Sequence, residues 1–281
     1  MENKRYIDLK VTPGTYVPPV MLDYPEDDPY EGMYKPVYDH EVKVDADYPF
    51  VDDSWQMKRD NWIVYNLIMR LIMRVFMLRI KMGLRFKGRG YLKQYKDQLK
   101  GGAITISNHV FRLDCPCVLL AVHGKRTTKI PMFAPNFGTS DEWYMRSVGG
   151  IPIPPAEEGM TAMKRFNEAF DEFHRRGYWF HIFPEAKRWE FYKPIRPFQK
   201  GAFTMAYKYN MPIVPCVITY RERKGIYRWF GPKEMPLLQV EICEPVLPDT
   251  TQPRRAEVDR MCEVARNEMI EKAGIMHNTW E

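Results

Sequence analysis

The sequence predicts an α/β protein whose mostly parallel sheet is flanked by helices and preceded by an amphipathic N-terminal helix. From residue 101 onward, short apolar runs alternate with longer segments of helical periodicity. The 281 residues are 45% hydrophobic, which is enough to bury one sizeable core. We therefore expect an acidic arm over residues 1–57, an amphipathic basic helix over 58–90 and an α/β domain over 91–281.

The N-terminal arm differs from the rest of the chain in charge and composition. Residues 1–55 contain 13 acidic and 5 basic residues, a balance of −8, so that the remaining residues carry +14. The arm is rich in proline, tyrosine and aspartate and keeps no period of 2 or 3.6 residues. We expect it to be extended, partly disordered or laid over the body, where its tyrosines and valines could anchor it. Its first residues lack the apolar stretch of a signal peptide.

The segment 58–82 predicts a helix that must bury most of its circumference. At roughly 100° per residue, five of its polar side chains fall on one narrow stripe, and Arg79 lies outside it. No run reaches the roughly 18 apolar residues of a spanning helix. We favour a membrane-interfacial helix with a basic flank, and the alternative is a core helix with a few surface arginines. The stripe comprises Arg59, Asn66, Arg70, Arg74 and Lys81, and the flank comprises Lys81, Arg85, Lys87 and Arg89.

The remaining elements follow from periodicity and from helix and strand boundary signals. Gly177 is placed to end one long amphipathic helix, and Asn210 and Pro212 end another. In a mostly parallel sheet, ligands bind at the carboxyl ends of the strands. Strands are expected at 103–106, 130–134, 178–183, 213–218 and 237–242, and helices at 117–122, 139–148, 157–176, 201–209 and 254–273.

A histidine and an aspartate follow the first of these strands. His109 stands five positions before Asp114, and Asp114 precedes Cys115-Pro116, where the N-cap of a helix belongs. A helix cap is a sufficient role for Asp114. A cap carboxylate is also rigid, and it could hold the imidazole of His109 in the tautomer that takes a proton from a hydroxyl.

A second polar segment, Phe183-Pro184-Glu185-Ala186-Lys187-Arg188, follows the strand at 178–183. Together with the His-x4-Asp spacing after Asn108, it resembles the glycerolipid acyltransferases of the lysophosphatidic acid acyltransferase type. The resemblance covers roughly residues 58–245. Two later blocks match in the same order, at Phe198-x-Lys200-Gly201-Ala202 and Met211-Pro212-Ile213-Val214-Pro215.

The resemblance implies the reaction and the roles of individual residues. In this family an acyl group passes from an acyl thioester, either acyl-coenzyme A or an acyl-carrier protein, directly to a hydroxyl of a lysophospholipid. His109 is the expected general base and Asp114 orients it. No metal and no further cofactor are expected. The residues expected to bind substrate are Glu185, Arg188, Lys187, Arg112, Lys200 and Gly201.

The chain departs from the family pattern at several positions. Ala186 and Lys187 replace the usual Gly-Thr, and Trp189 stands where a small polar residue is frequent. Pro155 occupies the position of an arginine that is expected to hold the acceptor phosphate. Lys187, Arg112 or Lys129 could substitute for that arginine, or the acceptor carries no phosphate there.

The cysteines and the other histidines indicate no further chemistry. The five cysteines are scattered, as expected of reduced cysteines in an intracellular protein. Cys115 and Cys117 have the wrong spacing for a zinc site. His181 alternates with apolar residues in a strand and is interpreted as a packed histidine. We look for the oxyanion-binding N–H groups at the helix that begins near Cys115.

Two other hypotheses about the function remain open. The basic body is also typical of a non-catalytic protein that binds lipid surfaces or nucleic acid, although the 58–82 helix is too apolar for nucleic acid. An acyltransferase of the same fold could act on another lipid alcohol or on an amine. Our expectation is a peripheral or monotopic protein on the cytoplasmic side of a membrane, with anionic lipids and the acyl donor as partners and no nucleic acid.

Overall fold

A mostly parallel sheet forms the centre of the protein, as seen in a computed structural model that describes residues 4–19, 22–34, 39–122, 128–231 and 234–280. Within these residues seven strands are ordered β2-β8-β7-β3-β6-β4-β5, and only the β7–β8 pair is antiparallel. A separate two-stranded sheet joins β1 to β9. The predicted fold class is confirmed. The strands are β1 (Lys10–Val11), β2 (Arg85–Lys87), β3 (Ile104–Ser107), β4 (Thr128–Phe133), β5 (Gly150–Ile153), β6 (Trp179–Ile182), β7 (Ile213–Arg221), β8 (Leu237–Ile242) and β9 (Ile275–His277).

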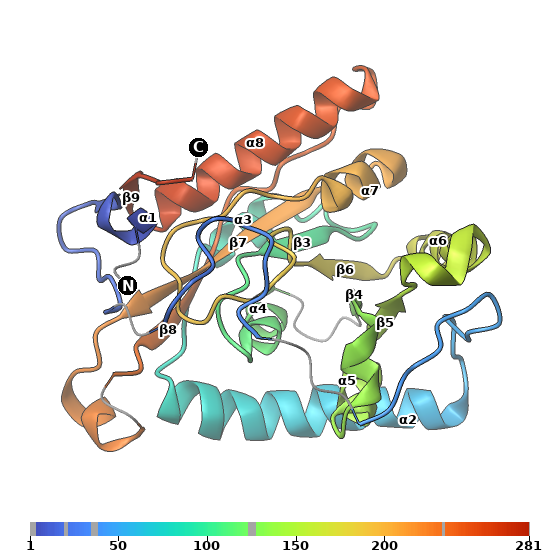
Figure 1. Cartoon of the computed structure of the whole chain (residues 1–281), viewed down its shortest axis with the longest axis horizontal. Helices are drawn as coiled ribbons and strands as arrows, with labels where there is room; N and C mark the ends of the chain where they lie inside the picture. The colour runs from blue at the N-terminus through green and yellow to red at the C-terminus, as the bar shows by residue number, and fades with distance from the viewer. Residues whose placement is uncertain (1–3, 20–21, 35–38, 123–127, 232–233, 281) are drawn as a thin grey trace.

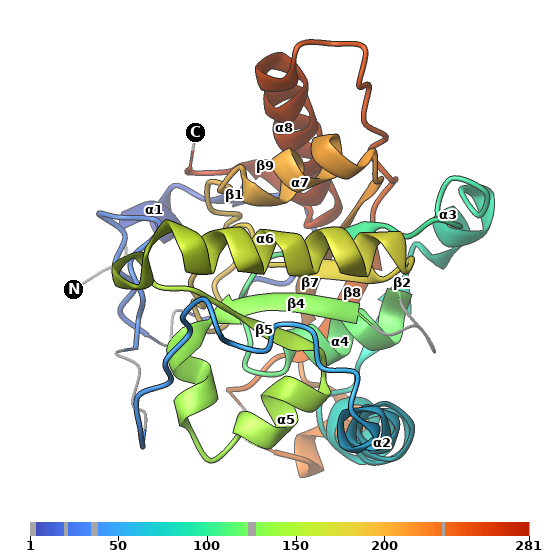
Figure 2. The same ribbon diagram turned by 90° about the vertical axis from the view of Figure 1, so that its right-hand side faces the viewer.

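Helices cover both faces of the sheet (Figures 1 and 2). The continuous helix α2–η1 lies along one side of the molecule, and α7 and α8 lie on the opposite side. The helices are α1 (Lys4–Ile7), α2 (Trp55–Ile63), η1 (Val64–Lys81), α3 (Arg89–Gln94), α4 (Asp114–Val122), η2 (Ala134–Gly138), α5 (Glu142–Ser147), η3 (Ala156–Glu158), α6 (Gly159–Arg175), α7 (Gly201–Tyr209), η4 (Gly225–Trp229) and α8 (Arg254–Lys272).

Two apolar clusters fill the space on the two faces. On one face, phenylalanines of α6 and apolar side chains of α7 and α8 pack on strand residues such as Ile104 and Phe180. On the other face, η1 and α4 pack on Val214, Leu238 and Val240. Because the central strands are covered on both sides, their side chains are buried in continuous runs, as β3 and β7 show.

The predicted helix over 58–90 is wrong in its C-terminal part. The helix ends at Lys81, and residues 85–87 form β2, which pairs in parallel with β8 at the edge of the sheet. Gly83 and Gly88 both have φ in the left-handed region, at 55° and 75°, where glycine avoids a steric penalty. A Cβ atom at Gly88 would lie 1.9 Å from the carbonyl oxygen of Ile242, so only glycine lets the chain pass β8 this closely.

From Val64 to Lys81 the helix is a π-helix, and its side chains recur every four or five residues. The buried stripe contains Val64, Met69, Leu78 and the following Met82, with the half-buried Met73 between them. An opposite stripe is exposed and apolar, and it comprises Leu67, Leu71, Ile72, Val75 and Ile80. The side chains of Phe76 and Met77 lie outside the described residues. The predicted wide apolar arc is therefore split between the core and the protein surface.

The acidic arm lies against the body. Val44 and Phe50 are buried in the cluster beneath α6, and Tyr24 packs with Trp189, Tyr192 and Trp280 in a separate aromatic cluster. The two-residue strand β1 pairs with β9 near the C-terminus. Apolar and aromatic anchors thus hold an arm that has little regular structure of its own.

Two strands of the sheet were not predicted. β5 is a four-residue strand at one edge of the sheet, and a run this short that begins with glycine and contains Pro152 carries little strand signal. β2 is three residues long and carries two basic residues, so its sequence was interpreted as part of the basic flank of the preceding helix. Among the described residues, no helix has the length and apolar character needed to cross a membrane.

Candidate active site

The imidazole of His109 and the carboxylate of Asp114 meet at the carboxyl end of β3. His109 Nδ1 lies 2.6 Å from Asp114 Oδ2, within hydrogen-bond distance. The His109 side chain is 22% exposed and that of Asp114 is 2% exposed. The sequence-predicted pair is thus assembled, with the histidine facing outward and the aspartate behind it. Nδ1 is committed to Asp114, so Nε2 is the nitrogen that can accept a proton.

Backbone donors hold the Asp114 carboxylate in place. Oδ2 accepts hydrogen bonds from the N–H groups of Val110 and Phe111, and Oδ1 accepts one from Cys115. The loop therefore folds back over the first turn of α4, and both roles considered for Asp114 are combined. A carboxylate fixed in this way stays oriented toward His109.

Glu185 holds the backbone of His109 in position. It is fully buried, and its Oε2 accepts a hydrogen bond of 2.9 Å from the backbone N–H of His109. Its Oε1 accepts from the backbone N–H of Arg196, and the Arg196 guanidinium pairs with Oε2 at 3.1 Å. Because both oxygens are used inside the protein, Glu185 does not face an acceptor hydroxyl. It joins the loops that follow β3 and β6.

Arg196 is a residue of this site that the sequence did not reveal. It is fully buried, donates to the carbonyl oxygens of Pro29 and Lys187, and lies 4.4 Å over the ring of Trp189. Desolvation lowers the pKa of Arg196, and the Glu185 carboxylate opposes that shift. The only sequence signal is indirect: a buried carboxylate at position 185 needs a cation nearby.

Backbone and amide hydrogen bonds brace the loop that carries His109. Asn108 is buried, and its side-chain amide bonds both the carbonyl and the N–H of Ile218 on β7. The backbone N–H groups of Trp189 and Phe191 donate to the carbonyls of His109 and Val110. The histidine is therefore held between β7 and the segment that follows Glu185.

Two aromatic contacts complete the packing around the imidazole. The ring of Phe183 stacks on that of His109, with centroids 4.0 Å apart. His181 lies behind Phe183, fully buried, and its Nδ1 is 3.0 Å from Thr105 Oγ1. Burial lowers the pKa of His181 to about 4, so it is neutral at physiological pH. The prediction that His181 is a packed histidine is confirmed.

The predicted substrate-binding cations of this loop lie near the pair but differ in their partners. Arg188 pairs with Glu190 at 3.2 Å, and the ammonium of Lys187 lies 4.4 Å over the ring of Phe133. Arg112 lies between His109 and Asp114 in sequence, and its side chain is exposed. Arg112 is the one of these three residues that is closest in sequence to the histidine.

Lys200, Gly201 and Lys129 are placed differently. Lys200 Nζ lies 2.5 Å from Asp259 on α8, and Gly201 begins α7, so these residues tie the later loop to α8. Lys129 stands at the amino end of β4, opposite Phe180, and its ammonium lies 4.5 Å over the ring of Phe173. His109 follows the carboxyl end of the parallel strand β3, so Lys129 lies at the other end of the sheet and does not replace the missing arginine.

The departures from the family pattern have structural counterparts. Ala186 has φ = 61°, in the left-handed region where the usual glycine would be unstrained. Trp189 is fully buried, and its indole N–H donates to the carbonyl of Glu31 in the arm. Its large side chain thus fills the space beneath the arm. Pro155 follows β5, at the same end of the sheet as His109.

The cysteines beside the pair are thiols. Desolvation and the nearby Asp114 charge raise the pKa of Cys115 and Cys117 well above the usual range. Thiolates are the reactive form, so neither residue is suited to act as a nucleophile. The N–H of Cys115 is bonded to Asp114 and that of Cys117 to Leu113, so these donors at the start of α4 are not free for an oxyanion.

Two comparisons relate the chain to known proteins. The chain is similar to the crystal structure of the 1-acyl-sn-glycerophosphate (LPA) acyltransferase PlsC from Thermotoga maritima, at 18% sequence identity and a TM-score of 0.43, over 76% of this chain and 95% of that chain. Residues 83–219 match the sequence model of the family described as Acyltransferase, and this segment contains His109, Asp114, Glu185 and Arg196. The match to the acyltransferase family is thus carried by the segment 83–219.

Proposed function

We propose that the protein transfers an acyl group from an acyl thioester to the hydroxyl of a lysophospholipid or a related lipid alcohol. The observation that carries this proposal is the 2.6 Å contact between His109 Nδ1 and Asp114 Oδ2 within an acyltransferase-family domain. The donor is acyl-coenzyme A or an acyl-carrier protein. A lysophospholipid such as lysophosphatidic acid is the acceptor that we favour.

His109 acts as the general base in the proposed reaction. Its Nε2 takes the proton of the acceptor hydroxyl while the oxygen attacks the thioester carbonyl carbon, which gives a tetrahedral intermediate. Collapse of this intermediate breaks the C–S bond, and the leaving thiolate takes the proton from the imidazolium. Asp114 stabilises the imidazolium that forms between these steps, so no enzyme nucleophile is required.

Lys187, Arg188 and Arg112 support an anionic acceptor. Arg112 follows His109 by three residues, and Lys187 and Arg188 directly precede Trp189, whose N–H donates to the His109 carbonyl; together they offer guanidinium and ammonium donors to a phosphate. The arginine that the resemblance expects at position 155 is a proline, so we assign its role to these three cations. A lipid alcohol without a phosphate would leave them without a ligand.

We also place the protein at the cytoplasmic side of a membrane as a peripheral or monotopic protein. The exposed apolar stripe of η1 and the exposed Trp62 of α2 suit an interfacial helix. Cysteines 115, 117, 216, 243 and 262 are all free, which suits a reducing compartment.

Product analysis by mass spectrometry tests the reaction. Purified full-length protein is offered lysophosphatidic acid, lysophosphatidylglycerol, monoacylglycerol and a long-chain amine, each with acyl-coenzyme A or acyl-carrier protein. We expect an acylated lysophospholipid, and we expect His109→Ala to lower kcat by about 10³-fold or more. His277→Ala, at an exposed position on β9, is the matched control and should keep native activity. Full activity of His109→Ala would exclude the mechanism, and acylation of the amine alone would exclude the acceptor.

A further inference from the structure

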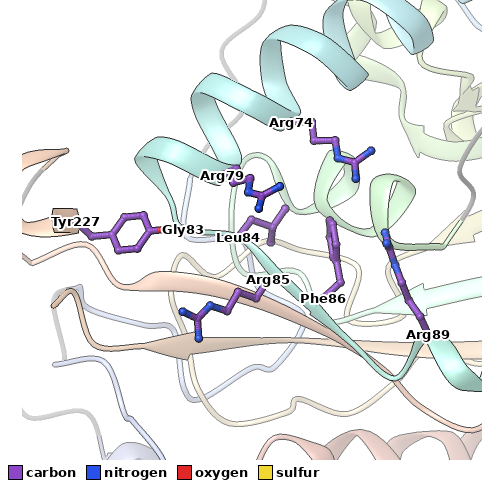
Figure 3. A pocket seen from close by; sticks show the side chains of 8 residues that line it. All are labelled: Arg74, Arg79, Gly83, Leu84, Arg85, Phe86, Arg89 and Tyr227. Carbon is purple, nitrogen blue, oxygen red and sulfur yellow. The ribbon is translucent and has the colours of Figure 1, made fainter. Parts of the chain in front are cut away.

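A second positively charged site lies away from the His109–Asp114 pair, between η1 and β2. It is an open pocket of about 520 Å³ that contains four arginines. Figure 3 shows Arg74 and Arg79 extending from the helix toward the strand that carries Arg85 and Phe86. This volume is in the range of small-molecule and headgroup sites. The lining residues are Arg74, Arg79, Gly83, Leu84, Arg85, Phe86, Arg89 and Tyr227.

The π-helical geometry creates this cluster. Arg70, Arg74 and Arg79 follow each other at intervals of four and five residues, the spacing of the buried and exposed stripes of η1. Arg79, which an α-helical period placed outside the arginine stripe, therefore lines the pocket with Arg74. The arginines occupy the flank of the helix, between its buried stripe and its exposed apolar stripe.

The positive charge of the pocket is not neutralised within the described part of the chain. There, no carboxylate lies within ion-pair distance of Arg74, Arg79 or Arg85. Arg89 is held by the carbonyls of Leu120 and Ala121 at the C-terminus of α4, and desolvation together with the nearby Arg74 charge lowers its pKa. Like charges held this close repel one another, so a bound anion would stabilise the arrangement.

An exposed apolar loop lies beside the pocket. Ile226, Trp229 and Phe230 are all exposed, and Trp229 is 86% accessible. Arg223 donates to the carbonyls of Lys81, Tyr227 and Phe230, which fixes this loop against the end of η1. Figure 1 shows the loop, in orange, beside the C-terminal end of the helix. Apolar side chains of two separate segments thus border one basic pocket.

We propose that this pocket binds the phosphate-bearing headgroup of an anionic glycerophospholipid in a bilayer, while Trp229 and the exposed stripe of η1 enter the acyl region. Charge complementarity selects this occupant, because guanidinium groups bind phosphate in a bidentate manner and interfacial basic residues attract anionic lipids. The flanking tryptophan and aliphatic side chains suit the membrane interface. The inference extends the membrane location given under the proposed function and does not depend on catalysis.

Vesicle flotation of the purified full chain tests the site. The probes are phosphatidylcholine vesicles with and without phosphatidylglycerol, at low and at high salt. We expect Arg74→Gln/Arg79→Gln to reduce the partition coefficient on anionic vesicles by about 30-fold, since each arginine near an anionic surface contributes about fivefold. Arg74→Lys/Arg79→Lys keeps the charge but not the bidentate geometry, so it should bind more weakly than the native protein and more tightly than the glutamine variant. Trp229→Ser should weaken binding to both kinds of vesicle.

The matched control changes the same net charge on the other face of the sheet. Arg254 and Arg255 lie at the exposed start of α8. The partition coefficient of Arg254→Gln/Arg255→Gln on anionic vesicles should be within twofold of that of the native protein. An equal loss in this control, or native binding by the pocket variant, would overturn the proposal. Coenzyme A is a soluble alternative ligand for the pocket, and calorimetric titration measures its binding. If Arg74→Gln/Arg79→Gln loses coenzyme A binding but binds vesicles as the native protein does, the pocket belongs to the acyl donor instead.

Flotation requires no turnover, so its outcome is separate from that of the acyl-transfer assay. His109→Ala should float as the native protein does. If it does so while the native protein transfers no acyl group, the lipid site stands and the proposed reaction fails. If acyl transfer is found and the pocket variant floats normally, the reaction stands and the lipid site fails.

Discussion

The two charged regions of the protein differ in how their charges are balanced. Around His109, each carboxylate has internal partners: Asp114 is held by backbone N–H groups, and Glu185 by Arg196. In the pocket beneath η1, Arg74, Arg79 and Arg85 have no such partner among the described residues. The first arrangement orients groups in advance of a reaction, and the second leaves positive charge available to an external anion.

The position of each region in the sheet fits this difference. The His109 loop follows the central strand β3 and is braced by β7 and by the segment after β6. The arginine pocket lies on the edge strand β2 and on a helix with an exposed side. Buried surroundings strengthen hydrogen bonds to a fixed partner, whereas an exposed edge permits exchange of a ligand. The following changes test whether the catalytic region depends on its internal partners.

Replacing Asp114 should produce the largest effect. Asp114→Asn keeps the shape of the side chain but removes the charge that stabilises the imidazolium, so we expect kcat to fall by about 10³-fold with little change in KM. Steady-state kinetics measure this effect. Asp141→Asn, at the exposed N-cap position of α5, is the matched control. Native kcat in Asp114→Asn would mean that Asp114 acts only as a helix cap.

Breaking the buried ion pair should reduce stability. Glu185→Gln leaves the Arg196 guanidinium buried without its counter-charge, and we expect the free energy of unfolding to fall by about 3 kcal/mol in urea titrations. Glu185→Gln/Arg196→Met removes the unpaired charge and should recover part of this loss. If the double variant is no more stable than the single variant, charge pairing is not the reason that Glu185 is buried.

Lys129 offers an internal comparison with the arginine pocket, because it is a buried cation that packs on aromatic rings. Burial lowers the pKa of Lys129 from 10.5 to about 8. The protonated form therefore destabilises the folded state below pH 8, and this penalty disappears as the pH rises from 8 to 10.5.

Lys129→Met should accordingly be more stable than the native protein at pH 7, by about 2 kcal/mol after the loss of the cation–π contact. Its advantage should shrink between pH 8 and 10. Urea titrations of both proteins across this pH range measure the difference between their free energies of unfolding. Other ionisable groups contribute equally to both proteins, so their contributions cancel in this difference. A difference that stays constant with pH would contradict the assigned cause.

The smallest effect is expected from the strained residue beside Glu185. Ala186 is exposed and has φ = 61°, so Ala186→Gly should raise the free energy of unfolding by about 0.5 kcal/mol, the relief of strain being partly offset by the greater flexibility of glycine. Ala156→Gly in η3, which is not in the left-handed region, should lower it. Thermal denaturation distinguishes these signs.

Much of the fold could be predicted because local patterns determine it. The order of strands and helices from β3 to α8 follows from apolar runs and from end signals such as Gly177 and Asn210. β5 was not predicted, because its four residues include Gly150 and Pro152 and become recognisable as a strand only through their pairing with β4. The end of the helix at Lys81 was also missed, since β2 is recognisable as a strand only once it pairs with β8.

The helix at 58–82 shows a further limit of periodicity. The amphipathic character of the segment was predicted, but its phase was calculated for an α-helix. The π-helical spacing brings Arg79 into line with Arg74, and Lys81 does not line the pocket. The period of a helix depends on its hydrogen-bond pattern, which side-chain chemistry does not specify.

The sequence by itself determined the alternation of elements, the spacing of His109 and Asp114, and the order of the blocks that mark an acyltransferase. These depend on neighbours within a few residues along the chain. Only the tertiary structure decided that Glu185, paired with Arg196, binds the backbone of His109, that Trp189 is buried beneath the arm, and that four arginines line one pocket. Each of these is a contact between segments far apart in sequence, so it forms only when the sheet brings those segments together.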